Sequence, residues 1–199
     1  MSRSFHTEKE SVTARRRGNM LPRVVVRAPA RGDIHPLTAR AIRGLFEHIP
    51  AEYLHGLTRI ELRARNAKVG QPFGCYQRRE KVVILYSVPP TIWEFPGLRA
   101  DFRRSLQACY AVISKEEGRV RVTWPDESLI SLWYYSDVFT HELGHHYVEQ
   151  YRHKNGRVGG RLFREFVAEM HARRFTEQLF KRRRTAKQET WKSDGSTAR

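Results

Sequence analysis

The stretch His141-Glu142-Leu143-Gly144-His145 combines two histidines and a glutamate at a spacing that suits metal chemistry. On a helix, positions four apart lie one above the other on the same face, so both imidazoles can reach one ion. Glu142 then lies beside the open coordination position, where a carboxylate can take a proton from metal-bound water. Zinc suits such a site because it binds neutral imidazole nitrogen and lowers the pKa of its bound water to about 7.

So short a motif also arises by chance, so its surroundings decide how much it means. No proline interrupts residues 126–160, and Asp126 or Ser128 can cap the start of a helix there. Asn155-Gly156 marks the end of that helix. Apolar residues cover most of its circumference, which is typical of a helix that crosses the middle of a domain. The context therefore favours a buried helix that carries the motif.

A third protein ligand should follow, because two imidazoles rarely hold zinc alone. A metzincin would need a glycine and a histidine where this chain has Val148 and Tyr151, which excludes that branch. The next helical run, 161–172, offers Glu165 and Glu169 one turn apart. Carboxylates near a buried face need a partner, and a zinc ion or a zinc-bound imidazole would provide one. The three- and four-residue spacing of its apolar residues predicts that this helix packs inward through Phe163, Phe166, Val167 and Met170.

The pattern His141-Glu142-x-x-His145, followed after a glycine-containing turn by Glu165-Phe166-Val167-Ala168-Glu169, resembles the gluzincin branch of zinc metallopeptidases. Small regulators of the ImmA/IrrE type belong to the same group. The resemblance covers residues 130–175 and implies that Glu165 is the third zinc ligand. It also implies that Glu169 hydrogen-bonds a ligand histidine, although the two glutamates are close enough to exchange roles.

The order of the remaining elements predicts an α+β domain. The sequence patterns predict strands at 58–65, 73–77 and 81–87, and either a strand or an entry segment at 21–28. They also predict helices at 37–49 and 100–108 and a hairpin of 110–113 with 119–124. The resemblance implies a zincin-like arrangement, in which a twisted, mixed or mostly antiparallel sheet backs the motif helix and the ligand helix follows. An edge strand of that sheet would pair with an extended substrate peptide, and 73–88 is the candidate segment.

The charge of +16 is concentrated at the two ends of the chain. Residues 1–23 and 173–199 together carry +10 of it. We expect one metallopeptidase domain at 21–180 between two basic tails, 1–20 and 181–199. The tails either serve solubility or contact the phosphates of nucleic acid without sequence specificity.

The sequence favours a cytoplasmic protein. No apolar run is long enough to span a membrane, and residues 1–5 have no secretory character. The cysteines, Cys75 and Cys109, fit a reduced setting better than a disulfide framework.

The predicted function is zinc-dependent hydrolysis of peptide bonds in a protein or peptide substrate. Glu142 would act as general base and zinc-bound water as nucleophile. The group that stabilises the oxyanion stays open among His146, Tyr147, Tyr151, His153, Arg161 and His171. The alternative is a zinc-binding regulatory or DNA-associated protein with little or no turnover. The intact Glu142 favours catalysis, because a structural zinc site needs no general base.

Overall fold

The computed structural model describes residues 21–66, 72–150, 163–174 and 176–177. The predicted basic tails and the predicted helix end at Asn155-Gly156 lie outside these residues. The described part is an α+β structure, as the sequence predicts, and it contains two sheets rather than one.

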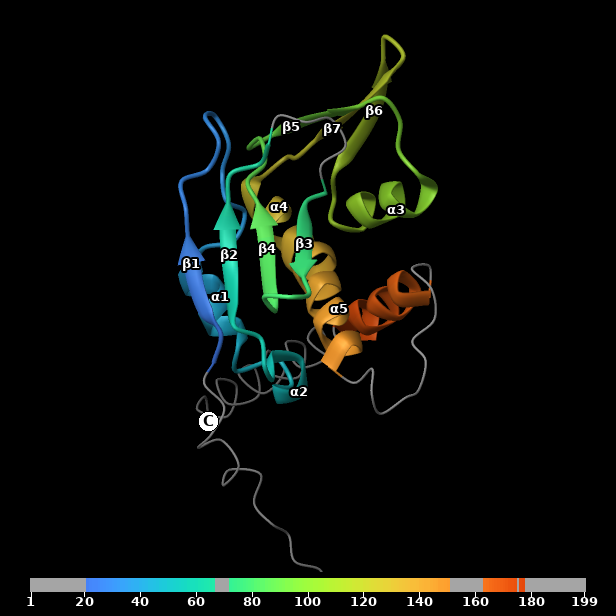
Figure 1. Ribbon diagram of the computed structural model, residues 1–199. Helices are drawn as coiled ribbons and strands as arrows, with labels where there is room; N and C mark the ends of the chain where they lie inside the picture. Colours follow the sequence, from blue (N-terminus) through green and yellow to red (C-terminus); the bar gives the residue numbers. More distant parts are fainter. Residues whose placement is uncertain (1–20, 67–71, 151–162, 175, 178–199) are drawn as a thin grey trace, which may run out of the picture.

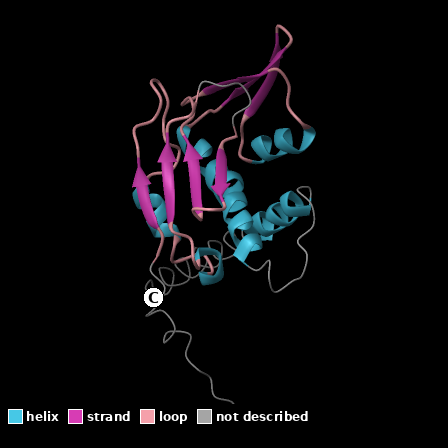
Figure 2. Ribbon diagram, viewed as in Figure 1, coloured by secondary structure: helices cyan, strands magenta, loops and turns pink. Residues whose placement is uncertain are grey.

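A four-stranded mixed sheet carries helices on one of its faces (Figures 1 and 2). Its strands, in spatial order, are β1 (Arg23–Val26), β2 (Arg59–Arg63), β4 (Val82–Tyr86) and β3 (Gly74–Gln77). The first three run parallel, and β3 is antiparallel to β4. Strands β2, β3 and β4 were predicted from their alternating or continuous apolar residues. For 21–28 the sequence left a strand or an entry segment open, and the structure contains strand β1 there. Of the segment 73–88, only β3 lies at the edge, because β4 is enclosed between β2 and β3.

The strand period of two assigns the side chains of β2 to opposite faces. Ile60 and Leu62 point into the core, next to residues of β4 and of the helices. Arg59, Glu61 and Arg63 share the other face. Alternation alone would place Glu61 in solvent, yet its side chain is only 2% exposed. Both flanking arginines donate hydrogen bonds to its carboxylate and lie over it.

The second sheet is antiparallel, in the order β5-β7-β6. Its strands are β5 (Ile92–Phe95), β6 (Val112–Glu116) and β7 (Arg119–Thr123). The predicted hairpin is confirmed as β6 and β7, whereas β5 was not predicted. It is four residues long and pairs with residues about thirty positions away (Trp93 with Val122), so it has no local signal.

The shorter helices are α1 (Ala39–Leu45), α2 (Ala51–Leu54) and α3 (Ala100–Ala108). Of these, α1 packs beside β1, α3 beside β6, and α2 against α5 (Thr140–Gln150). The bounds of α3 agree with the prediction. Helix α1 is shorter than the predicted 37–49, because the chain turns after Leu45, although Ile49 still packs into the core. Helix α2 is a single turn after Pro50 and was not predicted.

The predicted motif helix consists of three consecutive parts. They are α4 (Glu127–Trp133), a π-helical segment (Tyr134–Phe139) and α5 (Thr140–Gln150). Asp126, rather than Ser128, caps the start, because its side chain accepts the Ser128 N–H at 2.6 Å. The π-helical segment was not predicted. Such segments are rare and frequently lie at functional sites.

The helix of residues 163–174, continuing at 176–177, is named here the glutamate helix. The prediction that it packs inward is wrong for three of the four residues named: Phe163, Phe166 and Met170 are 53%, 66% and 47% exposed, whereas Val167 is half-buried. The glutamate helix instead buries its small residues, Ala168 and Ala172. Apolar periodicity selected the wrong side because it takes no account of side-chain size.

The close approach of the two helices explains this choice. A Cβ added at Gly144 of α5 would lie 2.7 Å from the backbone oxygen of Ala168 and 3.0 Å from its Cα. Only a residue without a Cβ on one helix, facing a small residue on the other, permits so short a distance. A phenylalanine at position 168 would force the helices apart.

None of the described helices is both long and apolar enough to cross a membrane. Cys75 and Cys109 are both free cysteines.

Substitution Gly144→Ala should separate α5 from the glutamate helix. The added methyl group meets backbone atoms of Ala168, which cannot move aside, so we expect a loss of about 1–3 kcal/mol in unfolding free energy. Chemical denaturation measures this loss. The matched control is Gly44→Ala in α1, where nothing lies within 4 Å of the added Cβ. That control should gain about 0.5–1 kcal/mol from helix propensity. Equal effects of the two substitutions would contradict the close contact.

Candidate metal centre

Three side chains from two helices converge on one point. The Nε2 atoms of His141 and His145 lie 3.0 Å apart, and each lies 3.4 Å from Oε2 of Glu165. The two histidines come from consecutive turns of α5, and the glutamate comes from the glutamate helix. These three residues form a group that could hold a metal ion.

The triangle has the dimensions of one face of a tetrahedral zinc site. Nitrogen and oxygen ligands at about 2.0–2.1 Å from a tetrahedral zinc lie about 3.3 Å from one another. The distances between the three ligand atoms, 3.0–3.4 Å, are close to this value. The donor set therefore fits zinc, with three protein ligands and one position left for water.

Glu169 lies on the other side of His141. Its Oε2 is 3.7 Å from Nδ1 of His141, the ring nitrogen that does not face the triangle. Arg173 holds Oε1 of the same carboxylate at 2.9–3.0 Å. The neighbouring His141 is the main cause of a lowered pKa of Glu169. A carboxylate in this position can orient the imidazole through its second nitrogen.

The two histidines differ in their electrostatics. Burial would lower the pKa of His141, but the carboxylates of Glu169, Glu142 and Glu165 outweigh it and raise that pKa above its ordinary value. The pKa of His145 is lowered, first by burial and second by the charge of His141. His145 is thus the readier of the two to present the neutral imidazole that a metal requires.

Glu142 is buried against the edge strand. Its Cγ would lie 3.1 Å from a Cβ added at Gly74, so the glycine leaves room for the carboxylate side chain. The charge of His141 and, to a smaller extent, the backbone of Tyr76 favour the ionised form of the Glu142 carboxylate. Burial nevertheless raises the pKa of Glu142 to about 7, with Glu165 adding to the increase. A carboxylate that titrates near neutral pH is suited to exchange a proton during catalysis.

Asp137 is a further acidic group beside the site. It lies one turn before His141, in the π-helical segment, and accepts hydrogen bonds from Ser105 of α3 and from Trp133 Nε1, the latter at 2.9 Å. Burial and, next, the charge of Glu169 raise the pKa of Asp137 to about 6. Asp137 thereby joins α3 to the start of the motif helix.

The π-helical segment is also hydrogen-bonded to the glutamate helix. The carbonyl of Ser136 accepts hydrogen bonds from the hydroxyl groups of Thr140, at 2.8 Å, and Thr176, at 3.0 Å. The N–H of Thr140 is directed to the carbonyl of Asp137 instead. The far end of the glutamate helix is thus tied to the chain just before the motif.

An aromatic group braces the other side of the two helices. The hydroxyl of Tyr53 in α2 hydrogen-bonds Nδ1 of His171 at 2.7 Å. The Tyr53 ring stacks on the ring of Tyr147 in α5, with 4.6 Å between the ring centroids. Tyr147 and His171 are themselves 4.5 Å apart. The brace connects α2, α5 and the glutamate helix.

These contacts bear on the oxyanion candidates. His146 is buried and hydrogen-bonds the hydroxyl of Tyr76 and the carbonyl of His55, at 3.0 and 2.9 Å. Tyr147 and His171 belong to the aromatic brace. None of the contacts described for these three side chains is with a candidate metal ligand. Tyr151, His153 and Arg161 lie outside the described residues.

Several residues that shape the site were not selected from the sequence: Gly74, Tyr76, Tyr53, Asp137 and Gly144. Gly144 had a recognisable signal, because a glycine inside a buried helix costs stability unless another backbone approaches closely. Gly74 and Tyr76 had none, since their roles depend on which strand lies beside α5.

Comparison with models of protein families, with curated proteins and with solved structures finds no match. The site must therefore be interpreted from its own geometry.

Removing each glutamate separately should distinguish ligand from orienting group. Glu165→Ala removes one of the three ligand atoms, so we expect zinc content after dialysis to fall from about one equivalent to below about 0.1. Glu169→Ala leaves the triangle intact and should weaken zinc binding by about 10–100-fold without abolishing it. Metal analysis and chelator competition measure both. Complete zinc loss in Glu169→Ala with retention in Glu165→Ala would reverse the assignment.

Asp137→Asn should change how stability depends on pH in protein treated with a chelator. Folding raises the pKa of Asp137 from its ordinary value of 3.8 to about 6, so the folded state favours the protonated form. The contribution of protonated Asp137 to the unfolding free energy is fully present below about pH 4 and is lost as the pH rises through 6. The amide needs no proton and can still accept the two hydrogen bonds. We expect the variant to be more stable than wild type by about 3 kcal/mol at pH 7.5 and by only about 1 kcal/mol at pH 4.5. Denaturation at both pH values tests this; a difference that does not vary with pH would refute it.

Proposed function

We propose that this protein is a zinc-dependent metallopeptidase. The observation that carries the proposal is the triangle of ligand atoms from His141, His145 and Glu165 with the buried carboxylate of Glu142 beside it. A purely structural zinc site would need no such carboxylate and would have four protein ligands.

A zinc ion in this triangle would polarise the carbonyl of a peptide bond and acidify a water molecule. Glu142 follows His141 directly in α5 and has a pKa of about 7. Its carboxylate can accept a proton from water and return it to the leaving amine.

The edge strand β3 supports an extended peptide as substrate. In the antiparallel pair with β4, Phe73 and Tyr86 are hydrogen-bonded, so the backbone groups of the alternate residues, Gly74 and Tyr76, face outward from the sheet. The same stretch of β3 contacts Glu142. A peptide added along this edge would pass the general base with its backbone hydrogen-bonded to β3.

Glu142→Gln should abolish cleavage and leave the metal bound. The amide has the shape of the carboxylate but cannot accept the proton, so the rate should fall by about 10²–10⁴-fold. The assay compares hydrolysis of a mixed library of unstructured peptides by zinc-loaded wild type and variant, with zinc content measured in both.

The matched control is Glu127→Gln, the same change at an exposed position in the first turn of α4. It should cleave at the wild-type rate. Unchanged cleavage by Glu142→Gln would refute the proposed role of Glu142. A wild-type protein that retains zinc and cleaves no peptide in the library would favour the alternative, a zinc-binding regulatory protein.

A further inference from the structure

The open face of the four-stranded sheet carries four arginines at the corners of a rectangle. They are Arg23 and Arg27 of the β1 segment and Arg59 and Arg63 of β2, and we name them the arginine face. Arg23 is paired with Arg59 in the parallel register. Arg27 continues the ladder by donating its N–H to Leu62 O at 2.9 Å, which places it beside Arg63. The sides of the rectangle are about 5 Å across the strands and about 13 Å along them.

This arrangement places like charges side by side twice. Like charges directly opposite on neighbouring strands destabilise a sheet. Glu61 lies between the four arginines and hydrogen-bonds Arg59 and Arg63, but Arg27 is 3.9 Å away and is 65% exposed. Arg59 is also paired with Glu80 of the β3–β4 turn at 2.6 Å, so two carboxylates against four guanidinium groups leave +2. Folding therefore does not account for the outer pair, Arg23 and Arg27.

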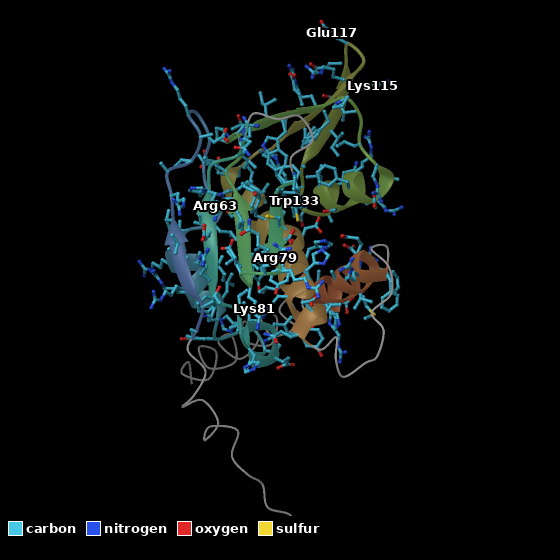
Figure 3. All side chains as sticks on the ribbon, in the orientation of Figure 1. Arg63, Arg79, Lys81, Lys115, Glu117 and Trp133 are labelled. Carbon is cyan, nitrogen blue, oxygen red and sulfur yellow. The ribbon has the colours of Figure 1, made fainter. Side chains whose placement is uncertain are left out.

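The positive charge is local to this side of the molecule. The β3–β4 turn adds Arg78, Arg79 and Lys81, of which Arg78 pairs with Glu149 of α5 at 2.6 Å. In contrast, residues 91–127, which form the second sheet and α3, contain six basic and six acidic residues. Figure 3 shows Arg63, Arg79 and Lys81 on the four-stranded sheet and its turn, with Lys115 distant at the tip of the β6–β7 hairpin.

The arginine face is on the opposite side of the sheet from the metal centre. Residues Ile60 and Leu62, which alternate with the arginines of β2, face the helices and the core. Within the part of the chain that the structure describes, the helices lie behind the sheet and none covers the arginine face (Figure 1). A ligand could therefore bind here without entering the proposed active site.

We propose that the arginine face binds single-stranded nucleic acid through its phosphate backbone. Guanidinium groups hold phosphates with two parallel hydrogen bonds, and all four cations of the face are arginines. Tyr86 of β4 is the register partner of Arg63 on the same face and is half-buried, so an aromatic ring adjoins the cations. Cations with an adjacent aromatic side chain are the combination that binds unpaired nucleotides without sequence preference.

The test is binding of a fluorescent mixed-sequence 20-nucleotide single strand to the full-length protein over a range of salt concentrations. Arg23→Gln/Arg27→Gln removes the two arginines that Glu61 holds least. The matched control, Arg104→Gln/Lys115→Gln, removes the same charge from exposed positions of α3 and β6. Both variants keep both tails, so any contribution of the tails is constant.

We expect the arginine-face variant to bind at least about 10-fold more weakly at 50 mM salt, and the slope of log affinity against log salt to fall by about 1.4, which corresponds to two lost phosphate contacts. The control should change affinity less than about 2-fold. Equal weakening in both variants would overturn the proposal, because it would indicate a general charge effect. Equal or tighter binding of a duplex of the same length, or of phosphatidylserine vesicles, would contradict the choice of single-stranded nucleic acid.

Ultraviolet cross-linking of the wild-type complex gives a readout that needs no variant. Mapping should place cross-links on peptides that contain residues 23–27, 59–63 or Tyr86. Cross-links confined to residues 1–20 and 178–199 would overturn the proposal and assign nucleic-acid binding to the ends of the chain.

Discussion

The contact between Gly144 and Ala168 determines whether the candidate site exists. A backbone-to-backbone approach of this kind brings Glu165 within 3.4 Å of both histidines. A wider helix spacing would leave two imidazoles and a carboxylate too far apart to share an ion. The hydroxyl of Thr176 and the aromatic brace around Tyr53 hold the same helix pair at two other points. Small residues at the contact and polar anchors around it thus define the geometry of the ligands.

Two acidic side chains at the site are buried. Glu142 and Asp137 have pKa values raised to about 7 and about 6, and in both cases burial is the main cause. A bound divalent cation is often the largest charge in such a place and favours ionised carboxylates near it. Neighbouring carboxylates add to the increase, Glu165 for Glu142 and Glu169 for Asp137. Arg173, paired with Glu169, is the nearby basic group that compensates part of this charge.

The four-stranded sheet separates two chemically different surfaces. Because successive side chains of a strand point to opposite faces, β2 contributes Ile60 and Leu62 to the core and Arg59 and Arg63 to the open face. The edge of the same sheet, β3, presents backbone groups beside Glu142. One sheet can therefore place Glu142 at its edge and four arginines on its open face.

The sequence by itself determined the local features: the histidine spacing on a helix, three of the four strands of the first sheet, the bounds of α3 and the two candidate glutamates. These depend on periodicity and on residue type, which act over a few neighbouring positions. The tertiary structure decided which side of the glutamate helix is buried, that Gly74 and Tyr76 border Glu142, that β5 pairs with β7, and that Arg23 and Arg27 stand beside Arg59 and Arg63. Each of these depends on the size and position of groups far apart in the chain. Apolar periodicity marked Phe163 and Phe166 for burial, but the distance between two helices admitted only Ala168 and Ala172.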